Sequence, residues 1–354
     1  RYTTDMYTAS VALPAVYGTG SPKGNNAEMK TDGWELSLSW RDSFKLGGKP
    51  FDYSIKAMVW DSKSVITKYV NDTGSLGTVK GFIENGGSPS SYYVGMTVGE
   101  IWGYTVAGLF RDQADIDSSA IHDFVQASDK VTRPGQVKIA DLDGNGFIDP
   151  GNFAVDDHGD LRIIGNQSPR YRYGVNLSAR WNGIGLSVFL QGVGARDWYP
   201  GSDAGMFWGK YGRPFFALIP SIHNYTDDMY SAERNNWDTA YWPRMTTYQS
   251  NGTKNWTRLL EIPNTRYIQS AAYLRVKNIQ LDYSFPKHIC SAIRLQGLKI
   301  YVNAENLFTF TPLHKYAPNF DPEGLSYDSD FASAADGYTY PILKSVTVGV
   351  NITF

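Results

Sequence analysis

The last ten residues, SVTVGVNITF (345–354), alternate strictly between two kinds of side chain. Val346, Val348, Val350, Ile352 and Phe354 are apolar, and every residue between them is small or polar. Successive side chains of a β-strand point to opposite faces, so this stretch predicts a strand with one apolar and one polar face. A half-buried strand of a soluble β-sandwich gives the same pattern, so this stretch alone does not identify the kind of β-protein.

Further alternating segments recur along the chain, at residues 34–41, 51–59, 171–182, 184–190 and 298–305. The alternation in YLRVKNIQLDYSF (273–285) changes phase at Lys277-Asn278, which predicts either a β-bulge there or a different strand start. The composition agrees, because the chain has 24 tyrosines, 10 tryptophans and 35 glycines but only 19% charged residues. Aromatic residues favour strands and glycine favours turns, so we expect an all-β fold.

The lengths of the connections indicate the topology. Residues 43–50, 182–183 and 286–297 are short joins, whereas residues 63–169, 195–271 and 311–343 are long. Short and long joins alternate, so all short joins lie at one end of an up-and-down meander. Outer-membrane barrels show this asymmetry, with tight periplasmic turns and long extracellular loops. The segment EIWGYTVAGLF (100–110) also alternates. We expect it either to pair with another loop strand, of which 91–96 is a candidate, or to lie outside the wall. A short helix is expected to follow at 113–125.

Several function classes are disfavoured by composition. The net charge is −2 and no Lys/Arg run occurs, so a nucleic-acid partner is not expected. Cys290 is the only cysteine, which excludes an internal disulfide and a Cys-rich metal site. The chain starts without an initiator Met or signal peptide, and we interpret it as a mature or truncated piece. The five histidines are scattered along the chain: His122, His158, His223, His288 and His314. We therefore expect no enzyme, although a pair of catalytic acids from distant loops can still assemble.

The most specific local motif is DLDGNGFID (141–149). Side-chain oxygens at positions 1, 3 and 5 with Gly at position 6 form the start of a calcium loop. The predicted ligands are Asp141, Asp143, Asn145, the carbonyl of Phe147, and Asp149 at position 9. Position 12 is an asparagine instead of the usual bidentate Glu. The alternative is a surface loop rich in Asx turns that binds no ion.

Several segments together resemble the C-terminal half of SusC/RagA-like TonB-dependent transporters. They are MKTDGWELSLSWRD, DLDGNGFID, DLRIIGNQSPRYRYGVNLSARWNGIGLSVFLQGVGARD, YLRVKNIQLDYSFP, LKIYVNAENLFTFT and YPILKSVTVGVNITF. They occur in the family's order and cover nearly all of the chain except 195–271. The chain departs from the family where PGNFAVDDHG follows the acidic loop. The last ligand of a metal site at 141–160 is therefore Asp160, Asp156 or Asn152.

The resemblance implies the C-terminal part (1–354) of a 22-stranded outer-membrane barrel of a Gram-negative bacterium. About eight wall strands are expected here, including a weak first one near 1–8, with extracellular loops at 63–169 and 195–271. The plug and the TonB-contacting part lie elsewhere in the polypeptide. The family imports oligosaccharides or peptides together with a SusD-like surface lipoprotein, and the apolar face of its wall contacts outer-membrane lipid. Phe354 then matches the terminal aromatic that serves as an insertion signal.

Contact with cargo or lipoprotein is predicted for aromatic residues of the second long loop: Trp198, Tyr199, Trp208, Trp237, Tyr241 and Trp242. Asp321 and Glu323 either line the extracellular mouth or cap a turn. A secreted calcium-dependent carbohydrate-binding β-sandwich is the alternative function, and it explains the acidic loop but not the loop asymmetry. A small self-contained porin is the third, but eight strands without a plug do not suit such long loops.

Overall fold

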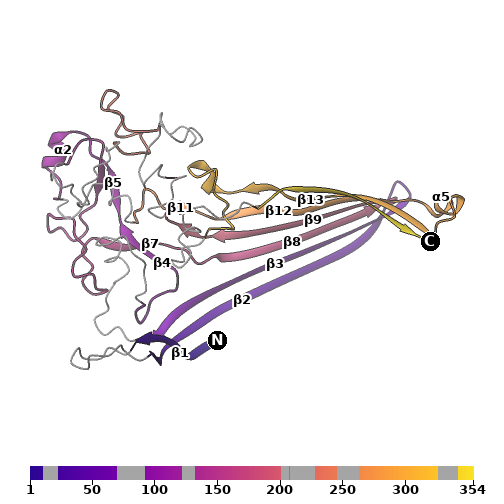
Figure 1. Ribbon diagram of the computed structural model, residues 1–354, viewed down its shortest axis with the longest axis horizontal. Coiled ribbons are helices and arrows are strands. Elements are labelled where there is room, and N and C mark those ends of the chain that lie inside the picture. The colour runs from indigo at the N-terminus through magenta and orange to yellow at the C-terminus, as the bar shows by residue number, and fades with distance from the viewer. Residues whose placement is uncertain are drawn as a thin grey trace.

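The structure is a computed structural model that describes residues 1–10, 23–69, 92–121, 132–200, 207, 228–244, 263–325 and 342–354. Its main element is an eight-stranded antiparallel sheet, which we call the wall. The wall strands stand in the sheet in the same order as along the chain, so the wall is a meander (Figure 1). The wall strands are β1 (Tyr2–Ser10), β2 (Lys23–Leu46), β3 (Lys49–Lys68), β8 (Arg170–Trp181), β9 (Ile184–Ala195), β12 (Tyr273–Ser284), β13 (Gly297–Phe310) and β14 (Ser345–Thr353).

The short connections all lie at one end of the wall, which we call the turn end (Figure 1). Gly47-Gly48 joins β2 to β3 and Asn182-Gly183 joins β8 to β9, and all four residues have positive φ. Two-residue hairpin turns of this kind match the right-handed twist of the strands. Helix α5 (Lys287–Ala292) lies between β12 and β13. The long segments gather at the opposite, loop end, so the predicted alternation of connections is confirmed.

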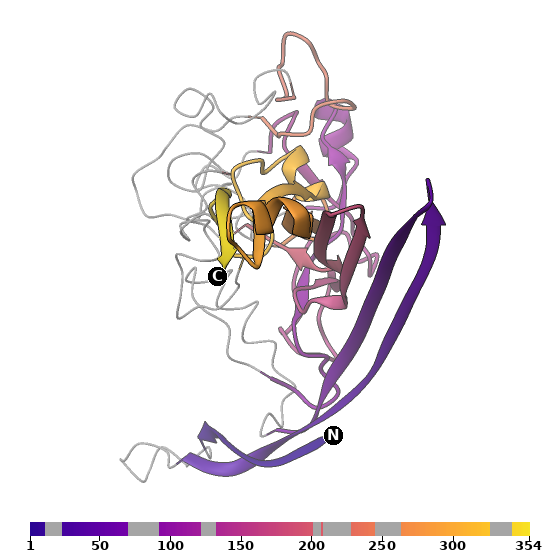
Figure 2. The ribbon, with the colours of Figure 1, turned by 90° about the vertical axis from the view of Figure 1, so that its right-hand side faces the viewer.

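One face of the wall is apolar and exposed. The register pairs Leu36 with Val59 and Leu38 with Ala57, and the apolar residues of later strands continue the same face. Leu38 is 61% exposed and Val348 72%, although both are large aliphatic side chains. A contiguous apolar surface of this size requires a non-aqueous neighbour. The sheet also curves from β1 and β2 round to β14 (Figure 2).

The predicted bulge in β12 is confirmed. The register shifts between Val276 and Asn278 in the pairing with β9 and again in the pairing with β13. Lys277 is the extra residue in the pairing with β9, and it restores Ile279 and Leu281 to the apolar face. In the pairing with β13 the extra residue lies in β13, where Asn306 and Leu307 stand opposite Lys277.

Side chains also pass across neighbouring strands on the polar face. The carboxylate of Asp282 on β12 lies over Gly185 of β9, where an added Cβ would come within 2.6 Å of its Oδ1. Asp282 is 4% exposed and pairs with Arg180 of β8 at 3.4 Å and with Lys299 of β13 at 3.1 Å. Because Gly185 has no side chain, one carboxylate connects three strands.

The segment after β3 differs from expectation. Strand β4 (Glu100–Tyr104) pairs with β7 (Leu161–Asn166), and β5 (Val106–Leu109) pairs with β6 (Val137–Ile139). The segment thus pairs with other loop strands and lies outside the wall, as expected, but the suggested partner 91–96 is wrong. Helix α2 (Gln113–Asp117) ends well before residue 125. The hydroxyls of Ser118 and Ser119 bond to the Asp115 carbonyl and compete with further helical bonds there. Residues 122–125 lie outside the described part.

Two wall strands, β2 and β3, are longer than the alternation of their residues predicts. Strand β2 starts at Lys23 instead of near residue 34, because its first residues pair with β1. Strand β3 runs to Lys68 and remains paired with β2 beyond the apolar band. Backbone pairing is independent of the side-chain pattern, so the alternation alone underestimated both lengths.

The buried core lies at the loop end, among the long segments. It joins residues that are far apart in sequence into one cluster, which we call the loop core. Short elements there are β10 (Asp197–Trp198), β11 (Gln269–Ser270) and the 3-10 turn η4 (Pro312–Lys315). Members of the loop core include Tyr104, Leu109, Val137, Ile148, Leu161, Trp198, Tyr267, Leu313 and Phe320. Among the described residues, no helix is long and apolar enough to cross a membrane.

Candidate functional site

The acidic loop folds around its own carboxylates. Asp141 accepts hydrogen bonds from the amides of Gly144 at 2.6 Å and Gly146 at 2.9 Å, and both glycines have positive φ. Asp160 accepts from the amides of Leu142 at 2.6 Å and Asp149 at 3.0 Å. The start of β7 is thereby tied back onto the loop.

Three predicted ligands come together in space. Asp141, Asp143 and Asp160 each place one carboxylate oxygen within 4.8 Å of the others. Asp149 instead accepts bonds from the Gly151 amide and the Asn145 side chain, outside this group. Among the three alternatives for the last ligand, only Asp160 is in the group.

The other two alternatives for the last ligand are not in this group, whereas Asn145 lies beside it, because its side chain donates to Asp143 at 3.2 Å. Asn152 donates to Asp157, and Asp156 is exposed. Phe147 is 46% exposed, and its amide donates to Asn145. A contribution from the Phe147 carbonyl stays a prediction.

No ion pair among the described residues compensates the charge of the acidic cluster. Burial raises the pKa of Asp160, and the nearby carboxylates of Asp143 and Asp141 raise it further. Within the described ranges, none of these three residues pairs with a lysine or arginine. Converging oxygen ligands without a protein cation fit a hard divalent ion such as calcium.

The aromatic residues predicted to contact cargo or lipoprotein are mostly buried. Trp198, Tyr199 and Trp242 are 2%, 1% and 1% exposed and belong to the loop core. Trp198 packs on Phe320 with ring centroids 4.9 Å apart. These side chains hold the long segments together.

The other members of that group differ in exposure. Tyr241 stacks flat on Tyr316 at 3.6 Å and is only partly buried, as is Trp237. Trp208 lies outside the described residues. A role of Trp237 and Tyr241 in binding stays a prediction.

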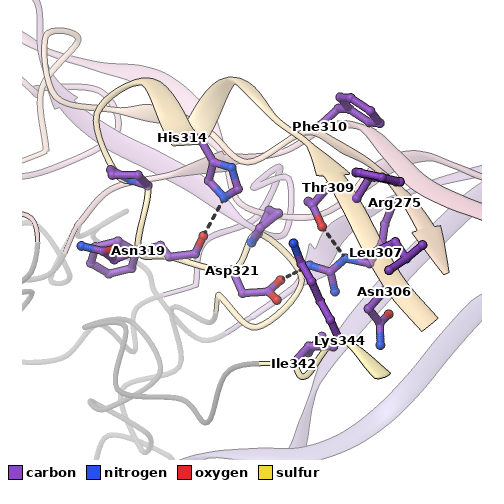
Figure 3. Close-up of a pocket in the computed structure, with 14 residues that line it drawn as sticks. Arg275, Asn306, Leu307, Thr309, Phe310, His314, Asn319, Asp321, Ile342 and Lys344 are labelled. Atoms are coloured by element: carbon purple, nitrogen blue, oxygen red, sulfur yellow. Dashed lines mark hydrogen bonds and ion pairs between the residues drawn. The ribbon is translucent and has the colours of Figure 1, made fainter. Parts of the chain in front are cut away.

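A charged cluster attaches the segment after β13 to the wall. Arg275 of β12 is 3% exposed and donates to Asp321 Oδ1 at 2.6 Å, Glu323 Oε2 at 2.6 Å and Thr309 Oγ1 at 2.9 Å. Lys277, the bulge residue, bonds to Glu323 at 2.8 Å. Figure 3 shows Asp321 and Thr309 pointing toward the Arg275 guanidinium. Asp321 and Glu323 thus bind the wall, and Asp321 also accepts from the Glu323 amide in a turn.

A cavity of about 390 Å³ lies beside this cluster, between β13 and the segment that follows it (Figure 3). His314 borders it and bonds to the Phe320 carbonyl at 3.2 Å. Arg196, at the end of β9, donates to the carbonyls of Pro322 and Leu325 from another side. The sequence reasoning missed Arg275, Lys277 and Arg196, although two cations on the polar phase of a strand were a signal.

Together, a curved antiparallel meander, an exposed apolar face and long segments at one end define part of a transmembrane β-barrel. No protein-family model matches the sequence. Curated relatives do: TonB-dependent receptor P3 of Formosa agariphila is 24% identical over 97% of this chain and 30% of its own length. TonB-dependent receptor P26 of the same organism is 22% identical over 99% of the chain and 32% of its length.

Solved structures give the same fold. The RagAB peptide transporter matches the whole chain with a TM-score of 0.59 and 18% identity, and its open-open state with 0.62, each over 32% of that chain. The chain spans about a third of the length of the relatives it matches. The predicted resemblance to the C-terminal portion of TonB-dependent transporters is thus confirmed, and so is the fold class.

Proposed function

We propose that the chain is the C-terminal part of the barrel of an energy-coupled importer in the outer membrane of a Gram-negative bacterium. The observation that carries this is the exposed apolar face of a meander whose long segments all lie at one end. The relatives are TonB-dependent receptors, and the structural neighbour is a peptide transporter. The loop end then faces outward, and a SusD-like lipoprotein covers it. The cargo is an oligosaccharide or a peptide, and no bond chemistry is involved.

The alternative β-sandwich needs a second sheet over the apolar face. Apart from the wall, the sheets in the described ranges have two strands each. An exposed apolar wall in water would aggregate, whereas lipid satisfies it.

Membrane fractionation tests the importer proposal. Detection of this sequence in native outer membranes, in a polypeptide of denatured mass far above 39.5 kDa, is the expected result. A 39.5 kDa protein that stays monodisperse without detergent would contradict it and favour the secreted binding module.

We further propose that Asp141, Asp143 and Asp160 hold a calcium ion that fixes the acidic loop. Their uncompensated charge and oxygen donors support this. Terbium luminescence of the purified full-length protein, with competition by calcium, is the assay. Asp141→Asn combined with Asp143→Asn should abolish the signal, and Asp117→Asn, an exposed acid on α2, is the matched control. Equal terbium binding by all three proteins would contradict the site.

A further inference from the structure

The cavity beside the Arg275 cluster lies along a free strand edge (Figure 3). Strand β13 pairs with β12 as far as Phe310, but with β14 only as far as Glu305. Residues 307–310 line the cavity, and no strand of the described part pairs with them on the β14 side. A free edge presents unpaired backbone N–H and C=O groups, so it can accept a further extended chain as a strand.

This edge is closed at one end. The side-chain amide of Asn306 donates to the Leu343 carbonyl at 3.1 Å, which holds the segment before β14 against β13. A strand added along 307–310 therefore ends where it meets residues 342–344. Further strands of a closed barrel join the wall at the outer edges of β1 and β14, so they do not fill the space between β13 and this segment.

The closed end of the edge carries an unpaired cation. The two cations and the two carboxylates of the Arg275 cluster pair with one another, so their charges cancel. Lys344 also lines the cavity, and it has no ion pair among the described residues. One positive charge is therefore in excess at the end where an added strand stops. An anionic group of a ligand offsets this charge.

The same end carries an acceptor without a donor. Asn306 Oδ1 is buried and accepts no hydrogen bond from the described residues. A buried acceptor without a donor costs free energy, so a ligand N–H group is favoured there. Phe308 and Phe310 line the cavity and are more than half exposed, so apolar surface is available as well. A cation, an acceptor and apolar rings thus share one cavity, whose size is in the usual range of ligand pockets.

We propose that this cavity binds the C-terminal end of an extended peptide. The peptide adds as a strand to residues 307–310, its terminal carboxylate binds Lys344, and a main-chain N–H group donates to Asn306 Oδ1. The opposite orientation places an N-terminal ammonium group against Lys344 and is disfavoured by repulsion of like charges. An acidic oligosaccharide supplies the anion but lacks the regular main-chain groups that pair with a strand edge. This inference rests on the proposed import function and adds the substrate class.

Binding of two matched probes to the full-length transporter, purified from native outer membranes, tests the carboxylate. The probes are a fluorescent apolar hexapeptide with a free C-terminal carboxylate and the same peptide as its C-terminal amide. Lys344→Gln should weaken binding of the free acid about tenfold and leave binding of the amide unchanged, because a charge-assisted hydrogen bond is lost. Lys315→Gln is the matched control, since it removes the same charge from η4, outside the cavity.

Two results of this assay would overturn the inference. Equal affinity of the unmodified transporter for both probes would show that no carboxylate is recognised. Equal weakening of both probes by Lys344→Gln would show that the lysine supports the fold instead of the ligand.

Photo-crosslinking in native outer membranes tests the occupant. Ile342, which lines the cavity, is replaced by benzoylphenylalanine, and a biotinylated form of the free-acid peptide is the probe. The expected result is a covalent peptide adduct that an excess of unlabelled free acid, but not of the amide, prevents. The inference fails if the adducts contain only lipopolysaccharide, only a biotinylated oligogalacturonide or only a preceding segment of the transporter's own chain, or if no adduct forms.

Peptide uptake separates this inference from the import function. If loss of the whole transporter leaves uptake of the free-acid peptide unchanged, the import function fails. If uptake needs the transporter but Lys344→Gln behaves like Lys315→Gln in the binding assay, only the C-terminal site is refuted.

Discussion

Arg275→Gln is expected to release the segment that follows β13 from the wall. The guanidinium is 3% exposed and holds Asp321, Glu323 and Thr309 at once. The substitution keeps a polar side chain but removes the charge and the forked donors. Asp321 then loses its only ion-pair partner among the described residues.

The size of the effect follows from the geometry. Removing one partner of a buried ion pair costs about 3–5 kcal/mol. The side chains of Asp321 and Glu323 keep 19% and 27% exposure, and Lys277 still pairs with Glu323. These compensations reduce the expected loss to about 2–3 kcal/mol of local opening free energy, or roughly 30- to 150-fold in the opening equilibrium.

Hydrogen exchange measures this opening directly. The amides of Phe320, Glu323 and Gly324 donate to Ala317, Asp321 Oδ1 and Asp321, respectively, and should exchange faster by that factor.

Two further variants test whether the loss of protection comes from the Arg275 contacts. Arg180→Gln is the control, because its pair with Asp282 is 3.4 Å long and Arg180 is half exposed. Arg275→Lys should not restore protection, because an ammonium group cannot reach three acceptors in a forked geometry. Unchanged exchange at residues 320–324 in correctly assembled Arg275→Gln protein would refute the argument.

Three other predictions concern the wall and its attached segments. Gly185→Val should displace Asp282 and lower the amount of assembled protein in outer membranes. Phe354→Ala should reduce insertion yield without changing the proteolysis pattern of inserted protein, because Phe354 is 82% exposed. Asp112 caps the N-terminus of α2, where its carboxylate accepts a hydrogen bond from the Asp115 amide at 2.8 Å. That amide and Arg111 hold the pKa of Asp112 below its usual range. Its capping of α2 is therefore fully present above about pH 4 and lost as pH falls through the lowered pKa. Amide exchange at Asp115 should report this, and Asp112→Ala should remove the pH dependence.

The sequence by itself determined the wall. The alternation of apolar and polar residues indicates which side chains of each strand face lipid. In a meander each wall strand pairs with the next wall strand along the chain, so the strand order also follows from the sequence. The position of the β12 bulge at Lys277, seen in the pairing with β9, was readable for the same reason, since an extra residue shifts the alternation. The helix near residue 113 was located correctly, but its length was not, because serines after Asp117 compete for the backbone.

Only the tertiary structure decided what the long segments do. Strand β4 pairs with β7 across more than fifty residues, and no local pattern encodes that choice. Trp198 and Trp242 are of a residue type that often contacts ligands, yet both are buried in the fold. Whether a side chain is buried depends on which other segments of the chain pack over it. Ligand spacing identified Asp141 and Asp143, whereas the approach of Asp160 to them required the turn back into β7. Local periodicity thus fixes strands, but contacts between distant segments arise only when the whole chain is packed.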